Sequence, residues 1–91
     1  MFDTSHIPNL DQHIYCEKQK ARLLRKSRWW QNRIQNCRCY YCQTPLAAAT
    51  VSMDHVVPLS RGGKSTKGNV VPSCKECNNR KKYLTPAELL L

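Results

Sequence analysis

The chain has 91 residues, with 15 Lys and Arg against six Asp and Glu, which gives a formal net charge of +9 at pH 7. This length is enough for one domain with a small apolar core and no more. The strong positive charge makes a polyanion the natural partner, with a merely soluble basic protein as the alternative.

Nothing in the sequence points to a membrane or to secretion. The longest apolar stretch is far too short to span a bilayer. Residues 1–10 contain Asp3, His6 and Pro8 and no apolar run, so no signal peptide is expected. We therefore expect no membrane partner and a cytoplasmic location, where cysteines are normally kept reduced.

Residues 1–36 are expected to form an N-terminal arm followed by a basic amphipathic helix. The segment from Asp11 to about Asn36 lacks Gly and Pro and is rich in Gln, Lys, Arg and Leu, which favours a helix. Its apolar face is predicted to contain Leu23, Trp30 and Ile34, with Leu24 alongside.

Six cysteines are present, and four of them form two Cys-x-x-Cys pairs separated by 31 residues. The pairs are Cys39 with Cys42, and Cys74 with Cys77. A two-residue gap lets both thiolates of a pair reach one ion, so we predict a structural Zn²⁺ rather than the disulfides of a small secreted protein. Of the other two, Cys16 is interpreted as a small helix residue, and Cys37 as a competitor of Cys39 that lacks the two-residue spacing.

Short extended segments are expected inside the loop that the cysteine pairs close. Residues 47–53 are predicted to lead into a strand that ends near Asp54 and His55. Val56–Val57 is expected to continue into a second, paired strand, although Pro58 limits the ladder hydrogen bonds there.

Loops and helices are expected in the remainder of the chain. Residues 60–65 should form a loop with two glycines that permit close backbone approach, and residues 69–72 another short extended piece. Ser73 is expected to cap a helix that runs to about Lys82, and Pro86 is expected to start a further helix.

Four polar residues in or beside this loop are candidates for catalysis, namely Asp54, His55, Asn69 and Asn78. Each is weak evidence by itself, because a His beside an Asp is usually an ordinary pair and a lone Asn is usually a turn or helix-surface residue. Their joint order and spacing are more informative, since a carboxylate, an imidazole and an amide can hold a hard cation beside a general base.

The segments from Asp54 to Gly63, from Asn69 to Val71 and from Cys74 to Lys81 resemble the HNH endonuclease motif. Residues 39 to about 82 are similar to the subgroup of that family with a four-cysteine zinc site. The resemblance implies a small α+β protein with the ββα-metal fold, stabilised by the four-cysteine zinc site and preceded by the basic helix. It places an HNH nuclease domain at residues 37–91.

The resemblance also implies a role for each candidate. His55 would be the general base that takes a proton from the attacking water, and Asp54 and Asn78 would be ligands of a catalytic Mg²⁺ or Mn²⁺. Asn69 would hold the loop between the strands through backbone hydrogen bonds and so aim His55. The literal motif reads His-Asn-His, whereas its last position in this sequence is Asn78. Similar members of the four-cysteine subgroup also have Asn there.

Several basic residues near these positions are candidates for contacts with nucleic-acid phosphates, with a solvated surface as the alternative for each. They are Arg25, Arg28, Arg61, Lys64, Arg80 and Lys81.

We therefore predict a metal-dependent DNA endonuclease or nickase that hydrolyses phosphodiester bonds. The alternatives are a catalytically silent zinc-stabilised nucleic-acid-binding module and a zinc-containing domain that docks on another protein. So small a module has few side chains to read bases, so its specificity is expected to depend on a homodimer or a larger protein partner.

Overall fold

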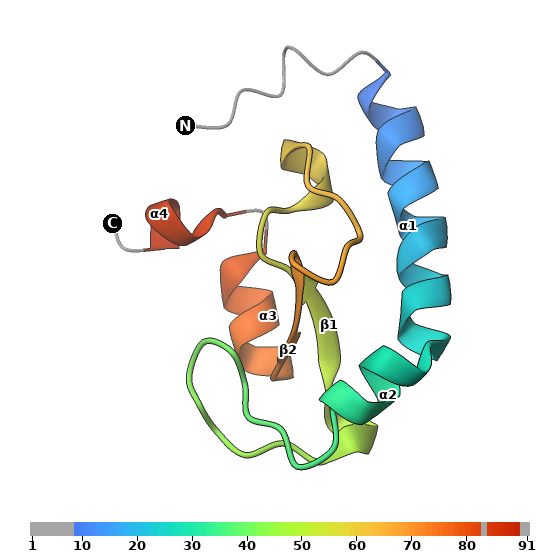
Figure 1. Ribbon diagram of the computed structural model, residues 1–91. Helices are drawn as coiled ribbons and strands as arrows, with labels where there is room; N and C mark the ends of the chain where they lie inside the picture. Colours follow the sequence, from blue (N-terminus) through green and yellow to red (C-terminus); the bar gives the residue numbers. More distant parts are fainter. Residues whose placement is uncertain (1–8, 83, 90–91) are drawn as a thin grey trace.

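The computed structural model describes residues 9–82 and 84–89, in which helices pack around a two-stranded antiparallel sheet (Figure 1). In Figure 1 the long helix α1 (Leu10–Lys26) runs along one side of the molecule, and α3 (Lys75–Lys81) lies on the other side of the sheet. The small α+β class predicted from the sequence is confirmed. The arm was predicted at residues 1–10, of which residues 1–8 lie outside the described residues and Leu10 belongs to α1.

The predicted N-terminal helix is in fact two helices that meet at Ser27. Helix α1 covers Leu10–Lys26, and helix α2 covers Arg28–Arg33. The Ser27 hydroxyl donates to the carbonyl of Leu24 at 2.6 Å and accepts from the backbone N–H of Trp30 at 3.2 Å. Because serine competes with the helix for these backbone groups, it closes α1 and caps α2. The prediction of one uninterrupted helix is therefore wrong.

The change of direction between the two helices brings α2 onto the small apolar core. Trp30 and Ile34 are buried against Cys37 and Val70. Leu23, which we expected on the same face, is 69% exposed, because the face of the helix changes where the chain turns. Cys37 is thus a core residue, in keeping with the frequent burial of unpaired cysteines.

The sheet is formed by β1 (Ser52–His55) and β2 (Val70–Ser73). The two strands are antiparallel, and His55 at the end of β1 is paired with Val70 at the start of β2. Pro72 is tolerated in β2 because its backbone faces away from β1: its carbonyl accepts from the N–H of Tyr40 at 2.9 Å, so its missing N–H costs the ladder no hydrogen bond.

Residues 47–53 lead into a strand that ends at His55, as predicted, and a single 3-10 turn, η2 (Ala48–Thr50), precedes β1. The predicted second strand needs correction. Val56–Val57 lies in a bend and makes no strand, so the partner of β1 is the later segment at residues 70–73.

The chain between the strands turns sharply at Gly62 and Gly63. The 3-10 turn η3 spans Leu59–Arg61, and Gly62 follows with a positive φ of 86°. A Cβ atom at Gly63 would lie 1.8 Å from the carbonyl oxygen of Val57, so no larger residue fits without a backbone shift. The two glycines therefore let the loop pack against the end of β1.

Helix α3 (Lys75–Lys81) follows β2 directly and contacts β1. Its N-cap is Cys74, whose Sγ accepts from the N–H of Cys77 at 3.3 Å, and not Ser73 as predicted. The Ser73 hydroxyl is instead buried, with no hydrogen-bond partner among the described residues. The short helix α4 (Pro86–Leu89) begins at the predicted proline.

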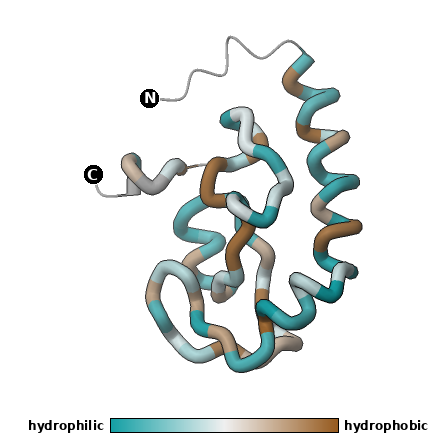
Figure 2. Tube along the Cα trace, viewed as in Figure 1, coloured by the Kyte–Doolittle hydropathy of each residue, from teal (hydrophilic) through white to brown (hydrophobic). Residues whose placement is uncertain are grey.

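Helices α1 and α3 are mostly hydrophilic along their length, whereas hydrophobic stretches gather in and beside the sheet (Figure 2). Many of the polar positions on these helices are Lys and Arg, which accounts for much of the net charge of +9. Within residues 9–82 and 84–89, no helix has the length and apolar character needed to cross a membrane.

Candidate active site and metal centre

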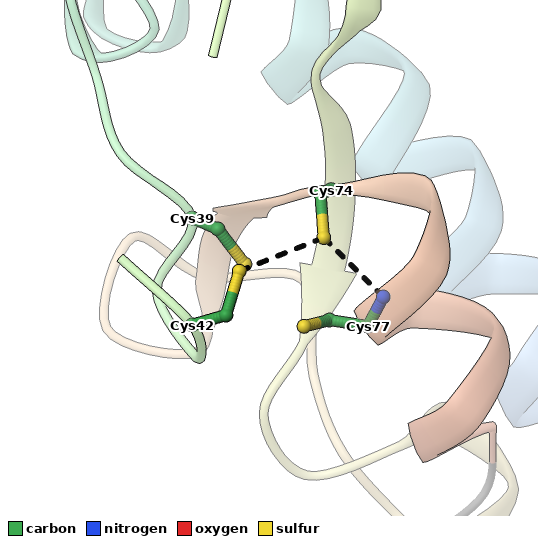
Figure 3. A group of neighbouring side chains, drawn as sticks. All are labelled: Cys39, Cys42, Cys74 and Cys77. Atoms are coloured by element: carbon green, nitrogen blue, oxygen red, sulfur yellow. Dashed lines mark hydrogen bonds between the residues drawn. The ribbon is translucent and has the colours of Figure 1, made fainter. Parts of the chain in front are cut away.

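The four paired cysteines converge on one point (Figure 3). Their Sγ atoms all lie within 4.8 Å of one another, and those of Cys42 and Cys74 are 3.8 Å apart. A tetrahedral Zn²⁺ with bonds of about 2.3 Å holds its sulfurs about 3.8 Å apart, whereas a disulfide has a length of about 2.05 Å. The 3.8 Å contact is therefore better explained as two ligands of one ion than as a thiol hydrogen bond. Donor type and spacing both fit a four-coordinate metal.

Backbone hydrogen bonds shape the first cysteine pair. The N–H of Cys39 donates to the carbonyl of Thr44, and the N–H of Gln43 donates to the carbonyl of Cys39, both at 2.9 Å. Gln43 adopts a left-handed conformation with φ 64°, which closes the turn so that both thiols of the pair face α3. The two other cysteines lie outside the cluster, with Cys16 exposed on α1 and Cys37 in the core.

Asp54 is buried in β1, and both of its side-chain contacts among the described residues are made by Oδ2. Tyr41, which lies inside the first cysteine pair, donates its phenolic hydroxyl to Oδ2. Burial and this hydrogen bond raise the pKa of Tyr41, so the phenol stays protonated and remains the donor. The Nζ of Lys81 is 3.4 Å from the same oxygen. These contacts fix the carboxylate while leaving Oδ1 available to a cation.

Lys81 is a buried residue, only 1% exposed. Besides its ion pair with Asp54, its ammonium group donates to the carbonyl of His55 at 2.8 Å. A buried ammonium held in this way cannot reach a phosphate on the surface, so our prediction that Lys81 contacts DNA is wrong. It instead compensates the buried charge of Asp54 and fixes the end of β1.

His55 ends β1, and its imidazole is partly buried. Its Nε2 lies 2.9 Å from the Oγ of Ser65. Burial lowers the pKa of His55, and although Asp54 opposes this effect, Arg25 and Lys81 reinforce it, so the pKa lies below its ordinary value. His55 is therefore a neutral imidazole at pH 7, able to accept a proton.

Asn69 binds the backbone of the loop that follows β1. Its Oδ1 accepts from the N–H of Val57 at 2.9 Å, and its Nδ2 donates to the carbonyls of Val57 at 3.1 Å and Lys64 at 2.8 Å. The backbone carbonyl of Asn69 accepts from the N–H of Val56 at 2.8 Å. These bonds hold the bend next to His55, which is the geometry that a positioning role requires.

A cleft of about 320 Å³ brings together three of the predicted site residues, Asp54, His55 and Asn78. On a regular strand adjacent side chains point to opposite faces, but β1 ends at His55 and the chain bends at Val56, so Asp54 and His55 both line the cleft. Asn69 is not part of the lining. The other lining residues are Ile14, Lys18, Met53, Pro58, Leu59, Ser60 and Lys82.

The other basic residues predicted to contact phosphates differ in whether their side chains already interact with the protein. Arg61 forms an ion pair with Glu88 at 2.7 Å, and the guanidinium of Arg80 lies 3.8 Å from the Sγ of Cys77. Three others are exposed: Arg25, Arg28 and Lys64. Lys18 on α1, which the sequence analysis did not single out, lines the cleft together with Lys82.

Besides Lys18, three residues in or next to the site were not predicted from the sequence, namely Glu17, Tyr41 and Ser65. Glu17 had a weak signal, because it and Asp11 are the two acidic residues of a basic helix. Tyr41 and Ser65 had none, since a tyrosine between two cysteines and a serine in a polar loop are both ordinary features of a single sequence.

Comparison with known proteins settles the family. The model of a family described as HNH endonuclease matches residues 39–90, which is more than half of the chain. This chain belongs to the HNH endonuclease family. The matched segment contains the four clustered cysteines, the two strands and the residues predicted for the HNH site.

Two relatives of this HNH chain are CRISPR-associated endonucleases Cas9. The protein of Corynebacterium diphtheriae is 42% identical over 48 residues, which cover 52% of this chain and 4% of the relative. The protein of Actinomyces naeslundii is 41% identical over 54 residues, which cover 58% of this chain and 5% of the relative. The HNH chain therefore spans only a small fraction of the length of these relatives.

Proposed function

We propose that this HNH protein is a metal-dependent endonuclease or nickase that hydrolyses phosphodiester bonds in DNA. The observation that carries the proposal is the single cleft lined by Asp54, His55 and Asn78. DNA is the proposed substrate because a net charge of +9 favours a polyanion, and because the two relatives are described as endonucleases.

Two metals of different character fit the donor atoms. The four cysteine thiols suit a structural Zn²⁺. The carboxylate of Asp54 and the amide oxygen of Asn78 are hard donors that suit Mg²⁺ or Mn²⁺. When bound there, such an ion supplies positive charge that stabilises the phosphate and the leaving oxygen.

The other residues of the site have separate roles in proton transfer, in positioning and in binding DNA. His55 takes a proton from the attacking water, because its lowered pKa keeps it neutral at working pH. Asn69 holds the adjacent bend. Lys18 and Lys82 line the cleft, which supports a role for both in contacting phosphate oxygens. The exposed Lys64 extends the basic surface beyond the cleft.

Incubation with supercoiled plasmid tests the proposal. We expect nicked or linear DNA with Mg²⁺ or Mn²⁺, and intact plasmid when EDTA is present. Zinc content and the circular dichroism spectrum, measured on the same samples, show whether the chelator has only removed the catalytic ion or has unfolded the protein.

Cleavage that persists in EDTA would contradict metal dependence. Retention of DNA binding without cleavage under all conditions would instead support the catalytically silent zinc-stabilised module. The ratio of nicked to linear product separates a nickase from an enzyme that cuts both strands.

A further inference from the structure

The hydrogen-bond partner of His55 belongs to a chain of contacts that reaches helix α1. His55 Nε2 lies 2.9 Å from Ser65 Oγ, and that hydroxyl donates to the backbone carbonyl of Glu17 at 2.6 Å. The backbone N–H of Ser65 donates to Glu17 Oε1, also at 2.6 Å. Ser65 is therefore held at two points by one residue of α1.

The protons in this chain can be assigned from the donors and acceptors. A serine hydroxyl has one proton, and a backbone carbonyl can only accept. The Ser65 proton therefore points to Glu17, and the hydroxyl offers a lone pair to His55. This requires the ring proton of His55 on Nε2, which leaves Nδ1 as the nitrogen that can take a proton.

Glu17 is held in place and can accept hydrogen bonds from Ser65 in a fixed geometry. It is only 4% exposed, and its Oε2 pairs with the ammonium of Lys20 at 3.1 Å. Burial raises the pKa of Glu17, but the hydrogen bond from Ser65 and the charge of Lys20 outweigh it, so the pKa lies below its ordinary value and the side chain is ionised at pH 7. Displacing a buried carboxylate from these partners is costly, so Ser65 has little freedom.

A second contact holds the same loop to the same helix. His13, one turn before Glu17 on α1, donates from Nε2 to the carbonyl of Gly63 at 2.8 Å. The loop at residues 63–65 is thus fixed between α1 and the end of β1, and it presents the Ser65 hydroxyl to His55.

The geometry points to Ser65 as a positioning residue that, held by Glu17, fixes the tautomer and the orientation of His55. This inference rests on the proposed function of His55 as the base. It makes α1 part of the site, although α1 lies before the segment at residues 39–90 that matches the family. Glu17 and Ser65 act through His55 and do not touch the substrate.

The tautomer of His55 is the direct test. Imidazole ¹⁵N shifts from long-range ¹H–¹⁵N spectra of the zinc-loaded full chain, recorded at a pH where His55 is neutral, distinguish the two forms. We expect the Nε2–H form in the parent protein and in Ser65→Thr, and a mixture in Ser65→Ala. The Nδ1–H form in the parent protein, or an unchanged tautomer in Ser65→Ala, would overturn the inference.

Cleavage kinetics give a second readout. Ser65→Ala is expected to lower kcat about 10- to 100-fold with KM within about twofold, and Ser65→Thr is expected to recover most of the rate. The exposed neighbour Thr66 provides the matched control, since Thr66→Ala should leave both constants unchanged. A kcat for Ser65→Ala equal to the parent value would contradict the positioning role.

The two readouts separate this inference from the proposed function. The parent spectrum requires neither a variant nor activity, so it is informative even if Ser65→Ala fails to fold. A parent protein with the expected tautomer but no cleavage would count against the nuclease proposal alone.

Discussion

Replacement of His55 by alanine is expected to slow plasmid cleavage by about 10²- to 10⁴-fold while DNA affinity stays within about twofold. In the proposed mechanism the imidazole takes a proton from water and does not hold the DNA, whereas affinity depends on Lys and Arg. The measurement is single-turnover cleavage of supercoiled plasmid, together with binding by fluorescence anisotropy at one fixed salt concentration.

Lys18→Ala is the contrasting variant, because Lys18 lines the same cleft from α1 but has no part in proton transfer. It is expected to weaken DNA binding and to reduce the salt dependence of affinity while retaining most of the rate at saturating DNA. If His55→Ala cleaves at the parent rate, the general-base role is wrong.

Cys74→Ser is expected to abolish zinc binding and to unfold the protein at room temperature. A structural zinc contributes about 10–16 kcal/mol to folding, which is comparable to or larger than the total stability of about 5–15 kcal/mol of a typical small domain. Serine can still cap α3 through its hydroxyl, as Cys74 does through Sγ, so the loss reports the missing metal ligand rather than the missing cap. Zinc content by native mass spectrometry and a thermal melt are the measurements.

Cys16→Ser is the matched control for this variant. Cys16 is exposed on α1 and lies outside the cysteine cluster, so its replacement should change neither the zinc content nor the melting curve. If Cys74→Ser melts like the parent protein and still binds zinc, the cysteine cluster is not the metal site that holds the fold together.

The parts of the fold that could be predicted from the sequence are those that local chemistry determines. The Cys-x-x-Cys spacing predicted that four distant thiols converge, and they do. The small α+β class and the family are likewise confirmed. The order of Asp54, His55 and Asn78 indicated which side chains share a cleft, while their catalytic roles remain proposals.

The parts that could not be predicted depend on tertiary contacts. Arg80 and Lys81 are neighbours in a run of basic residues, and the sequence does not distinguish them. The packing of α3 against β1 buries Lys81 next to Asp54 and leaves Arg80 exposed. Ser27 interrupts a segment of high helix propensity because α2 must turn to bury Trp30. The contact between Glu17 and Ser65 joins residues 48 positions apart, which no local pattern indicates.

The central claim is that Asp54 and Asn78 hold one divalent cation beside His55, and Mn²⁺ titration followed by NMR tests it most directly. Mn²⁺ broadens the signals of nearby nuclei, so no cleavage is needed, and the four thiolates are expected to retain Zn²⁺ because they are soft ligands. We predict that broadening begins at the amides around Asp54 and Asn78 and is much weaker in Asn78→Ala. Broadening that begins at another part of the molecule, or that is the same in Asn78→Ala, would contradict the claim.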